Sequence, residues 1–274
     1  SEALKATGNL QPKYDKGEDI YKALADTLDA AMAVLEANNS TSLFAKADPL
    51  FGGNTTKWIK FANTIKLRLI LRSNGKVTFT NTTFNSKGFV TEDALVNPGY
   101  TKIDGKQNPA WSTWAFDAAG TAPTAASQRI PTPYILTFYN GGKILDTVRA
   151  KLTFNTGLNV PTNQLGYQGD DAKKGVKPSA WYVVVDKDKL ETPPNLGILK
   201  SPDMGQPLML AAESYFIQAQ ANLKGITGTV ADAEMNYKAG VFASFKYLEK
   251  AGTNELKAGQ NPTSDTAIYF ADNI

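Results

Sequence analysis

The chain has 274 residues, with 29 basic and 26 acidic side chains and neither cysteine nor histidine. This composition excludes a disulfide framework, a thiolate nucleophile, Ser-His and Cys-His dyads, and metal sites built from thiolate or imidazole. The formal net charge of +3 comes from nearly balanced signs, so neither nucleic acid nor an anionic membrane surface is expected as a partner. A carboxylate pair, a lysine nucleophile or an oxygen-ligated Ca²⁺ ion stays open.

The first predicted element is an amphipathic helix that follows Asp15 and ends near residues 38–39. Asp15 and Glu18 have the spacing of a capping box at its start. Apolar residues then recur at steps of three and four, as the helix period requires: Ile20, Leu24, Leu28, Ala31, Met32 and Leu35.

A second helix is predicted from residue 55 to about Arg72, after a loop marked by proline and glycine at residues 48–54. Its apolar stripe consists of Trp58, Phe61, Ala62, Ile65 and Leu69. We expect the two helices to pair as an antiparallel hairpin over residues 14–74.

This second helix is also cationic, because it has no acidic residue between positions 55 and 72. Its basic residues are Lys57, Lys60, Lys66, Arg68 and Arg72. They could form a groove for an anion or an acidic glycan. The pattern favours the simpler interpretation, in which they extend around an amphipathic helix and pair with acids elsewhere in the fold.

Residues 75–206 differ in character, since they contain most of the 14 prolines of the chain. Helical periodicity is weak in this segment apart from residues 134–148. The best strand candidate is residues 181–185, a run of β-branched and aromatic side chains. We therefore predict a long loop-rich insertion that contains little β-structure.

Helical character returns at Pro207, a favourable first-turn residue, and continues to Gly225. A further helix with apolar residues at steps of three and four is predicted up to Gly252. The small and aromatic positions between Ala211 and Ala239 follow the pattern of a tetratricopeptide hairpin. One such hairpin cannot bury its own apolar face, which suggests that the helices stack into a larger helical layer.

The predicted fold is therefore mainly α, with tetratricopeptide-like helical hairpins and one insertion. We expect residues 1–274 to form a single domain fragment. It consists of a hairpin at 14–74, a loop-rich excursion at 75–206 and a second hairpin at 207–252.

Several segments, taken in order, resemble the SusD-like (RagB-type) outer-membrane lipoproteins of Bacteroidetes, and they extend over nearly the whole chain. The N-terminal ones are Ser1-Glu2-Ala3-Leu4, Leu10-Gln11-Pro12-Lys13-Tyr14-Asp15 and Glu18-Asp19-Ile20-Tyr21. Further ones are Asp48-Pro49-Leu50-Phe51-Gly52-Gly53, Lys57-Trp58-Ile59-Lys60-Phe61-Ala62-Asn63, Lys66-Leu67-Arg68-Leu69, Leu71-Arg72 and Asn97-Pro98. Ala212-Glu213-Ser214-Tyr215-Phe216-Ile217-Gln218-Ala219-Gln220-Ala221 and Gly225 complete the set.

The resemblance implies a cell-surface receptor that binds a nutrient glycan and delivers it to a SusC-like TonB-dependent transporter. It also implies that the chain is a middle fragment of a protein about twice as long. The expected location is the surface of the outer membrane, held by a lipid anchor outside this fragment. No cofactor is expected.

A glycan receptor needs aromatic platforms bordered by amides or carboxylates, because sugars present flat C–H faces and hydroxyl edges. The insertion offers such residues, and our candidates are Asn108, Trp111, Trp114, Tyr167, Trp181 and Tyr182. The alternative for each tryptophan is that it packs the irregular insertion onto the helices.

Two acidic motifs, Asp170-Asp171 and Asp186-x-Asp188, could ligate Ca²⁺ through oxygen. Neither has the spacing of a calcium loop, so solvated loop acids are the better interpretation and no metal site is predicted. No carboxylate pair stands out as the catalytic pair of a glycosidase.

We expect non-enzymatic capture of an oligosaccharide followed by its delivery to the transporter. One alternative is a tetratricopeptide scaffold that binds peptides, which would show three or more contiguous repeats and no long insertion. The other is a glycoside hydrolase, which would place two carboxylates about 5 to 10 Å apart across a cleft.

Overall fold

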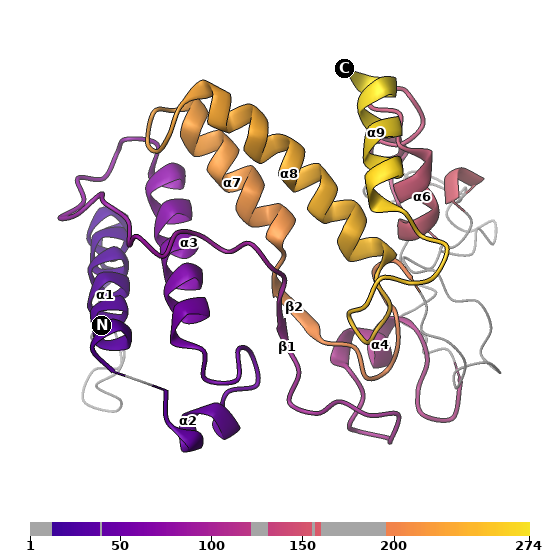
Figure 1. Ribbon diagram of the computed structural model, residues 1–274, viewed down its shortest axis with the longest axis horizontal. Helices are drawn as coiled ribbons and strands as arrows, with labels where there is room; N and C mark the ends of the chain where they lie inside the picture. Colours follow the sequence, from indigo (N-terminus) through magenta and orange to yellow (C-terminus); the bar gives the residue numbers. More distant parts are fainter. Residues whose placement is uncertain (1–12, 39, 122–130, 155–156, 160–195) are drawn as a thin grey trace. The chain divides into compact units, whose positions relative to one another are not determined.

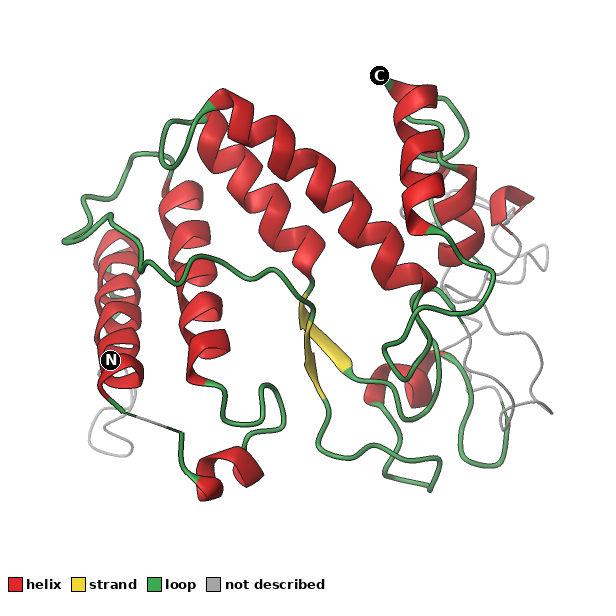
Figure 2. Cartoon of the chain, in the orientation of Figure 1, coloured by secondary structure: helices red, strands yellow, loops and turns green. Residues whose placement is uncertain are grey.

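The computed structural model describes residues 13–38, 40–121, 131–154, 157–159 and 196–274. Helices dominate this part of the chain, and a pair of short strands is the regular β-structure in it (Figures 1 and 2). These observations confirm the predicted mainly α fold. The chain divides into a first unit of Ser1–Glu92 with Glu213–Tyr237 and a second unit of Asp93–Ala212 with Lys238–Ile274.

The first unit contains the predicted N-terminal hairpin, formed by α1 (Gly17–Ala37) and α3 (Thr55–Ser73). Met32 packs against Ile59 and Ala62 near the start of α3, whereas Asp29, one turn earlier, binds Lys66 further along it. The two helices are therefore antiparallel, as predicted. A short helix, α2 (Ser42–Ala47), lies within their connection and was not expected from the sequence.

The N-termini of α1 and α3 differ in whether a side chain caps the helix. Lys16 occupies it in α1 and makes no side-chain cap hydrogen bond. The predicted capping box at Asp15 is therefore wrong, because a lysine side chain has no acceptor atom. In α3 the position belongs to Asn54, whose Oδ1 accepts a 3.0 Å hydrogen bond from the backbone N–H of Lys57.

The tetratricopeptide-like pair consists of α7 (Ala211–Leu223) and α8 (Val230–Glu249). Ile217 and Ala221 of α7 share a buried cluster with Leu67 and Leu71 of α3. The two helices of the pair are joined by the side chains of Asn236 and Asn222, whose Nδ2 and Oδ1 atoms are 2.9 Å apart. A further helix, α9 (Pro262–Asn273), follows in the second unit.

The sheet consists of β1 (Ala94–Val96) and β2 (Gln206–Met209), which pair antiparallel with Pro207 opposite Leu95. The prediction that Pro207 opens a helix is wrong, because α7 begins at Ala211. Proline is tolerated in β2 because both strands of a two-stranded sheet are edge strands. At the start of α7, the carboxylate of Asp93 accepts a 3.0 Å hydrogen bond from the backbone N–H of Ala211.

Residues 134–148 do not form the continuous helix that their periodicity suggested. α5 (Pro133–Leu136) and α6 (Thr147–Thr153) are separated by a turn in which Gly141 has a φ of 89°. That backbone conformation favours glycine and interrupts a helix. The predicted strand at residues 181–185 lies outside the described residues.

Two further short elements lie in the described part of the second unit, α4 (Pro109–Trp114) and the 3-10 helix η3 (Gly157–Asn159). α4 carries two of the four tryptophans of the chain. Its position therefore decides what these tryptophans can contact.

Candidate functional site

Asn108 is the residue that fixes the start of α4. Its Oδ1 accepts hydrogen bonds from the backbone N–H groups of Ala110 and Trp111, at 2.9 and 3.0 Å. Its Nδ2 donates to the carbonyl of Met204 at 3.0 Å, and the side chain is fully buried. Asn108 thus caps the helix and ties it to the segment before β2, which leaves its amide unavailable to a ligand.

Trp111 is fully buried in a cluster with Ala115, Leu199 and Met204. Its ring centroid lies 6.2 Å from that of Phe116. Among the described residues, no hydrogen-bond partner meets its Nε1 atom. An indole packed on all sides cannot offer a face to a sugar, so this geometry favours the packing alternative for Trp111.

Trp114 lies one turn further along α4 and is half-buried against the edge of the same cluster. Trp114 is therefore less buried than Trp111 on the same helix. Of the six candidates, Trp114 is the one whose described surroundings are compatible with stacking on a sugar. Tyr167, Trp181 and Tyr182 lie outside the described residues and stay predictions.

An aromatic and cationic group that sequence reasoning missed lies after α4. Tyr134 is 61% exposed and makes an edge contact with Phe138, with 5.4 Å between ring centroids. The Nζ of Lys143 lies 5.2 Å from the Tyr134 ring and 5.5 Å from the Phe138 ring. The turn after α5 brings these side chains together, and helical periodicity alone gave no signal for it.

Three of the five basic side chains of α3, those of Lys57, Lys66 and Arg68, pair with acids, as the simpler interpretation held for the group. Lys57 bonds to Glu92 at 2.9 Å, and Arg68 bonds to Glu213 of α7 at 2.8 Å. Both pairs are partly exposed, so each contributes at most about 1 kcal/mol.

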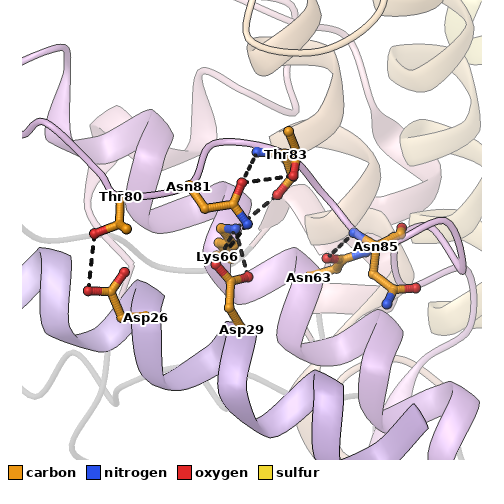
Figure 3. A network of polar contacts seen from close by, with 8 residues as sticks. All are labelled: Asp26, Asp29, Asn63, Lys66, Thr80, Asn81, Thr83 and Asn85. Carbon is orange, nitrogen blue, oxygen red and sulfur yellow. Dashed lines mark hydrogen bonds and ion pairs between the residues drawn. The ribbon is translucent and has the colours of Figure 1, made fainter. Parts of the chain in front are cut away.

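Lys66 forms the centre of a buried network shown in Figure 3. Its Nζ bonds to both carboxylate oxygens of Asp29, at 2.7 and 2.8 Å, and to the carbonyl of Thr83 at 2.9 Å. Asn81 donates to the same carboxylate at 3.0 Å. The Lys66 side chain has no exposed surface, so this ammonium is a structural group and not part of an anion groove.

Lys200 is a described lysine of the second unit whose pKa is strongly perturbed. Burial lowers its pKa to about 7, although the nearby Asp93 carboxylate opposes the shift. Its Nζ donates to the carbonyls of Tyr247 and Lys250 at the end of α8. These contacts, with only 4% of the residue exposed, leave no path to a substrate, so the geometry does not support a lysine nucleophile.

Among the described carboxylates, Glu249 has a strongly perturbed pKa. Burial raises that pKa to about 7, and the neighbouring Asp265 carboxylate adds to the effect. A glycosidase acid also has a raised pKa, but it must reach the glycosidic oxygen in a cleft. Glu249 has no exposed surface, so this pair does not meet that requirement.

The described part of the chain contains no group of three or more acidic side chains that could hold a metal ion. The two acidic motifs, Asp170-Asp171 and Asp186-x-Asp188, lie outside the described residues. Within the described ranges, no helix is long and apolar enough to cross a bilayer.

Comparison with known proteins gives one family and a consistent set of folds. A sequence model of the SusD-like family, described as "Starch-binding associating with outer membrane", matches residues 1–269. No curated protein sequence matches the chain.

Solved structures with a similar fold include SusD homologues from three bacteria. The Bacteroides uniformis protein is 23% identical, with a TM-score of 0.62 over 93% of this chain and 50% of its own. The Bacteroides fragilis homologue is 18% identical, with a TM-score of 0.62 over 99% of this chain and 57% of its own. The Parabacteroides distasonis homologue is 18% identical, with a TM-score of 0.55 over 96% of this chain and 52% of its own.

The chain thus spans about half the length of these structures, and at this identity the likeness shows the fold. The sequence match covers both the helical hairpins and the insertion between them. The chain belongs to the SusD-like family.

Proposed function

We propose that this protein is a non-enzymatic receptor that binds a nutrient oligosaccharide at the surface of the outer membrane and delivers it to a SusC-like TonB-dependent transporter. The observation that carries the proposal is the family match over residues 1–269, whose description names starch binding and outer-membrane association. A lipid anchor outside the 274 residues would hold the protein there.

The second unit is the proposed ligand-binding part. Trp114 is the half-buried tryptophan of a helix that Asn108 and Trp111 hold in place, and we assign its indole to the ligand. Tyr167, Trp181 and Tyr182 belong to the same long insertion and are proposed as further aromatic contacts. Asn108 and Trp111 act indirectly in this proposal, since both are fully buried.

Capture without chemistry agrees with the surroundings of the perturbed groups. Lys200 and Glu249 have pKa values that would suit acid-base or nucleophilic catalysis at neutral pH. Both are buried away from solvent, where a polysaccharide cannot reach them. Binding would therefore rest on aromatic stacking and hydrogen bonds, each of modest strength.

The test is calorimetric titration of the full-length protein with a panel of neutral and acidic oligosaccharides, followed by product analysis of the same samples. We expect saturable binding of at least one sugar, recovered intact. Trp114→Ala should weaken that binding about tenfold, as loss of one stacking contact of about 1.4 kcal/mol requires.

Trp58→Phe is the matched control, because Trp58 lies in α3 of the first unit and its Nε1 donates to Asp48 at 2.8 Å. We expect this variant to bind like the wild type. Cleaved sugar in the product analysis would overturn the receptor proposal in favour of a hydrolase. Equal loss of binding in both variants would overturn the placement of the site.

A further inference from the structure

The turn after α5 holds an ammonium group against two aromatic rings. The Nζ of Lys143 lies 5.2 Å from the ring centroid of Tyr134 and 5.5 Å from that of Phe138. The two rings meet each other at 5.4 Å in an edge contact. A cation is attracted to an aromatic face at such distances, so the rings favour one position for a lysine side chain that is otherwise flexible.

Backbone hydrogen bonds fix the turn that carries this lysine. The N–H groups of Lys143 and Ile144 donate to the carbonyl of Thr137, the C-cap residue of α5, at 2.7 and 3.2 Å. The N–H of Gly141 donates to the carbonyl of Ile144 at 3.0 Å. Lys143 therefore extends from a defined backbone position beside α5.

The same turn is also tied to α9. The N–H of Leu145 donates to Oδ1 of Asn273 at 2.8 Å, and Nδ2 of Asn273 donates to the carbonyl of Leu145 at 2.8 Å. Asn273 is the last residue of α9. Groups supported by regular elements are held more precisely than groups on a free loop, so the ammonium and the rings form a preorganised set.

The described part of the protein does not neutralise the charge of Lys143. Lys66 of α3 has a carboxylate partner in Asp29, whereas no acidic side chain among the described residues forms an ion pair with Lys143. The acid nearest in sequence, Asp146, is 5% exposed and bonds to Arg149 instead. The ammonium is thus available to an anionic group from outside.

Tyr134 provides a ring surface beside this charge. It is 61% exposed, and Lys143 is exposed as well. An accessible tyrosine ring can stack on the C–H face of a sugar, and an ammonium can form a charge-assisted hydrogen bond with a carboxylate on that sugar. A neutral sugar would use the ring but not the charge, so the pair can distinguish the two kinds of sugar.

We propose that Tyr134 and Lys143 form a subsite for an acidic sugar, a uronic acid residue that stacks on Tyr134 while its carboxylate pairs with Lys143. This inference rests on the proposed function and names the class of glycan. The carboxylate of a uronic acid is attached directly to the pyranose ring, so its charge lies at the edge of the stacked sugar. The 5.2 Å between Nζ and the Tyr134 centroid is comparable to the width of such a ring, so one residue reaches both groups.

The test is calorimetric titration of the full-length protein with trimers of galacturonate and of glucuronate, each as the free acid and as the methyl ester. The ester keeps the sugar rings and removes the charge. We expect the wild type to bind at least one free acid about fivefold more tightly than its ester, as an exposed ion pair allows.

Lys143→Met should bind the acid and the ester alike. Lys151→Met is the matched control, because Lys151 is an exposed lysine of α6 in the same unit; it should keep the wild-type preference. Tyr134→Ala should weaken binding of the acid about tenfold, and Tyr134→Phe, which keeps the ring, should bind it like the wild type. Circular dichroism confirms that each variant is folded.

The outcomes separate this inference from the proposed function. If the wild type binds a glycan but prefers no free acid to its ester, the acidic subsite is overturned and the receptor proposal stands. A preference for the acid that Lys143→Met retains would overturn the assignment to this turn. Absence of binding to every sugar, neutral or acidic, would overturn the proposed function and this inference with it.

Discussion

The two units differ in how they treat their buried polar groups. In the first unit, the side chains of Lys66 and Asn63 are fully buried and hydrogen-bonded, Lys66 to Asp29 and Thr83 and Asn63 to Asn85. In the second unit, the buried Trp111 Nε1, Ser201 Oγ and Thr266 Oγ1 atoms have no hydrogen-bond partner among the described residues. A buried polar atom without a partner costs about 1 to 3 kcal/mol.

The two units therefore differ in what their buried polar groups contribute to stability. A fully paired network specifies one arrangement of α1, α3 and the segment around residues 80–85, as a scaffold requires. Unpaired buried atoms are uncommon in native proteins and call for a specific explanation. Among the described residues, the second unit therefore carries a desolvation cost at these atoms that the paired network of the first unit avoids.

The largest effect is expected from breaking the network of the first unit. Asp29→Ala leaves the buried Lys66 ammonium without its carboxylate partner, which should lower the free energy of unfolding by about 3 to 5 kcal/mol. Urea denaturation measures this loss. Asp26→Ala is the control, because Asp26 is exposed and makes a 3.3 Å contact with Thr80; we expect a change below about 1 kcal/mol.

The double variant Asp29→Ala with Lys66→Met sharpens the same test. Removing both charges should recover much of the loss, since the remaining methionine carries no unpaired ammonium. A double variant no more stable than Asp29→Ala would show that the pair does not act as described.

A comparable loss is expected in the core of the second unit. Trp111→Ala removes a fully buried indole from its contacts with Ala115, Leu199 and Met204, which should cost about 3 to 5 kcal/mol. Trp114→Ala should cost clearly less, because Trp114 is half-buried. Thermal unfolding of the two variants gives the order, and equal losses would contradict the distinction between them.

A smaller effect is expected at the start of α4. Asn108→Ala removes the cap of two backbone N–H groups and the bond to Met204, for a loss of about 2 kcal/mol. Asn54→Ala is the matched cap variant in the first unit, where one N–H is capped, and about 1 kcal/mol is expected. A larger loss of stability for Asn54→Ala than for Asn108→Ala would contradict this order.

A separate effect concerns pH. The pKa of Glu249 is raised from 4.5 to about 7, so between these values the folded state holds a proton that the unfolded state has lost. Stability from this group is therefore present below about pH 4.5 and falls as pH rises to about 7. Glu249→Gln should flatten this part of the profile, as measured by Tm at pH 5 and pH 7.

Lys200 should make stability depend on pH in a different range. Its pKa is lowered from 10.5 to about 7, so the unfolded state binds more protons between these values and stability rises with pH there. The two groups therefore act in adjoining pH ranges. An unchanged slope below pH 7 in the Glu249→Gln variant would contradict the assignment to Glu249.

The regular helices could be predicted because each one buries a stripe with the helix period. This applies to α1, α3, α7 and α8, whose apolar residues recur at steps of three and four. The start of α7 was misplaced because Pro207 favours a helix start locally, whereas its pairing with Leu95 is a contact distant in sequence. Such tertiary contacts leave no local signal.

The candidate site was harder to predict for a physical reason. Trp111 and Trp114 are three residues apart in a six-residue helix, and sequence alone does not reveal which of them faces the core. The cluster that buries Trp111 comes from residues 199–204, far along the chain. The turn that brings Lys143 to Tyr134 depends on Gly141 and its positive φ, which sequence reasoning did not weigh.

The most direct test of the central claim is a fluorescence titration of the Trp58→Phe variant of the full-length protein with an oligosaccharide that the wild type binds. This variant removes the tryptophan of α3 and keeps Trp111, Trp114 and Trp181 as reporters. The account predicts that the saturable change in emission persists with an unchanged Kd, because the proposed ligand contacts belong to the insertion and not to α3. Loss of the change, with binding still present by calorimetry, would place the ligand at the first unit and contradict the account.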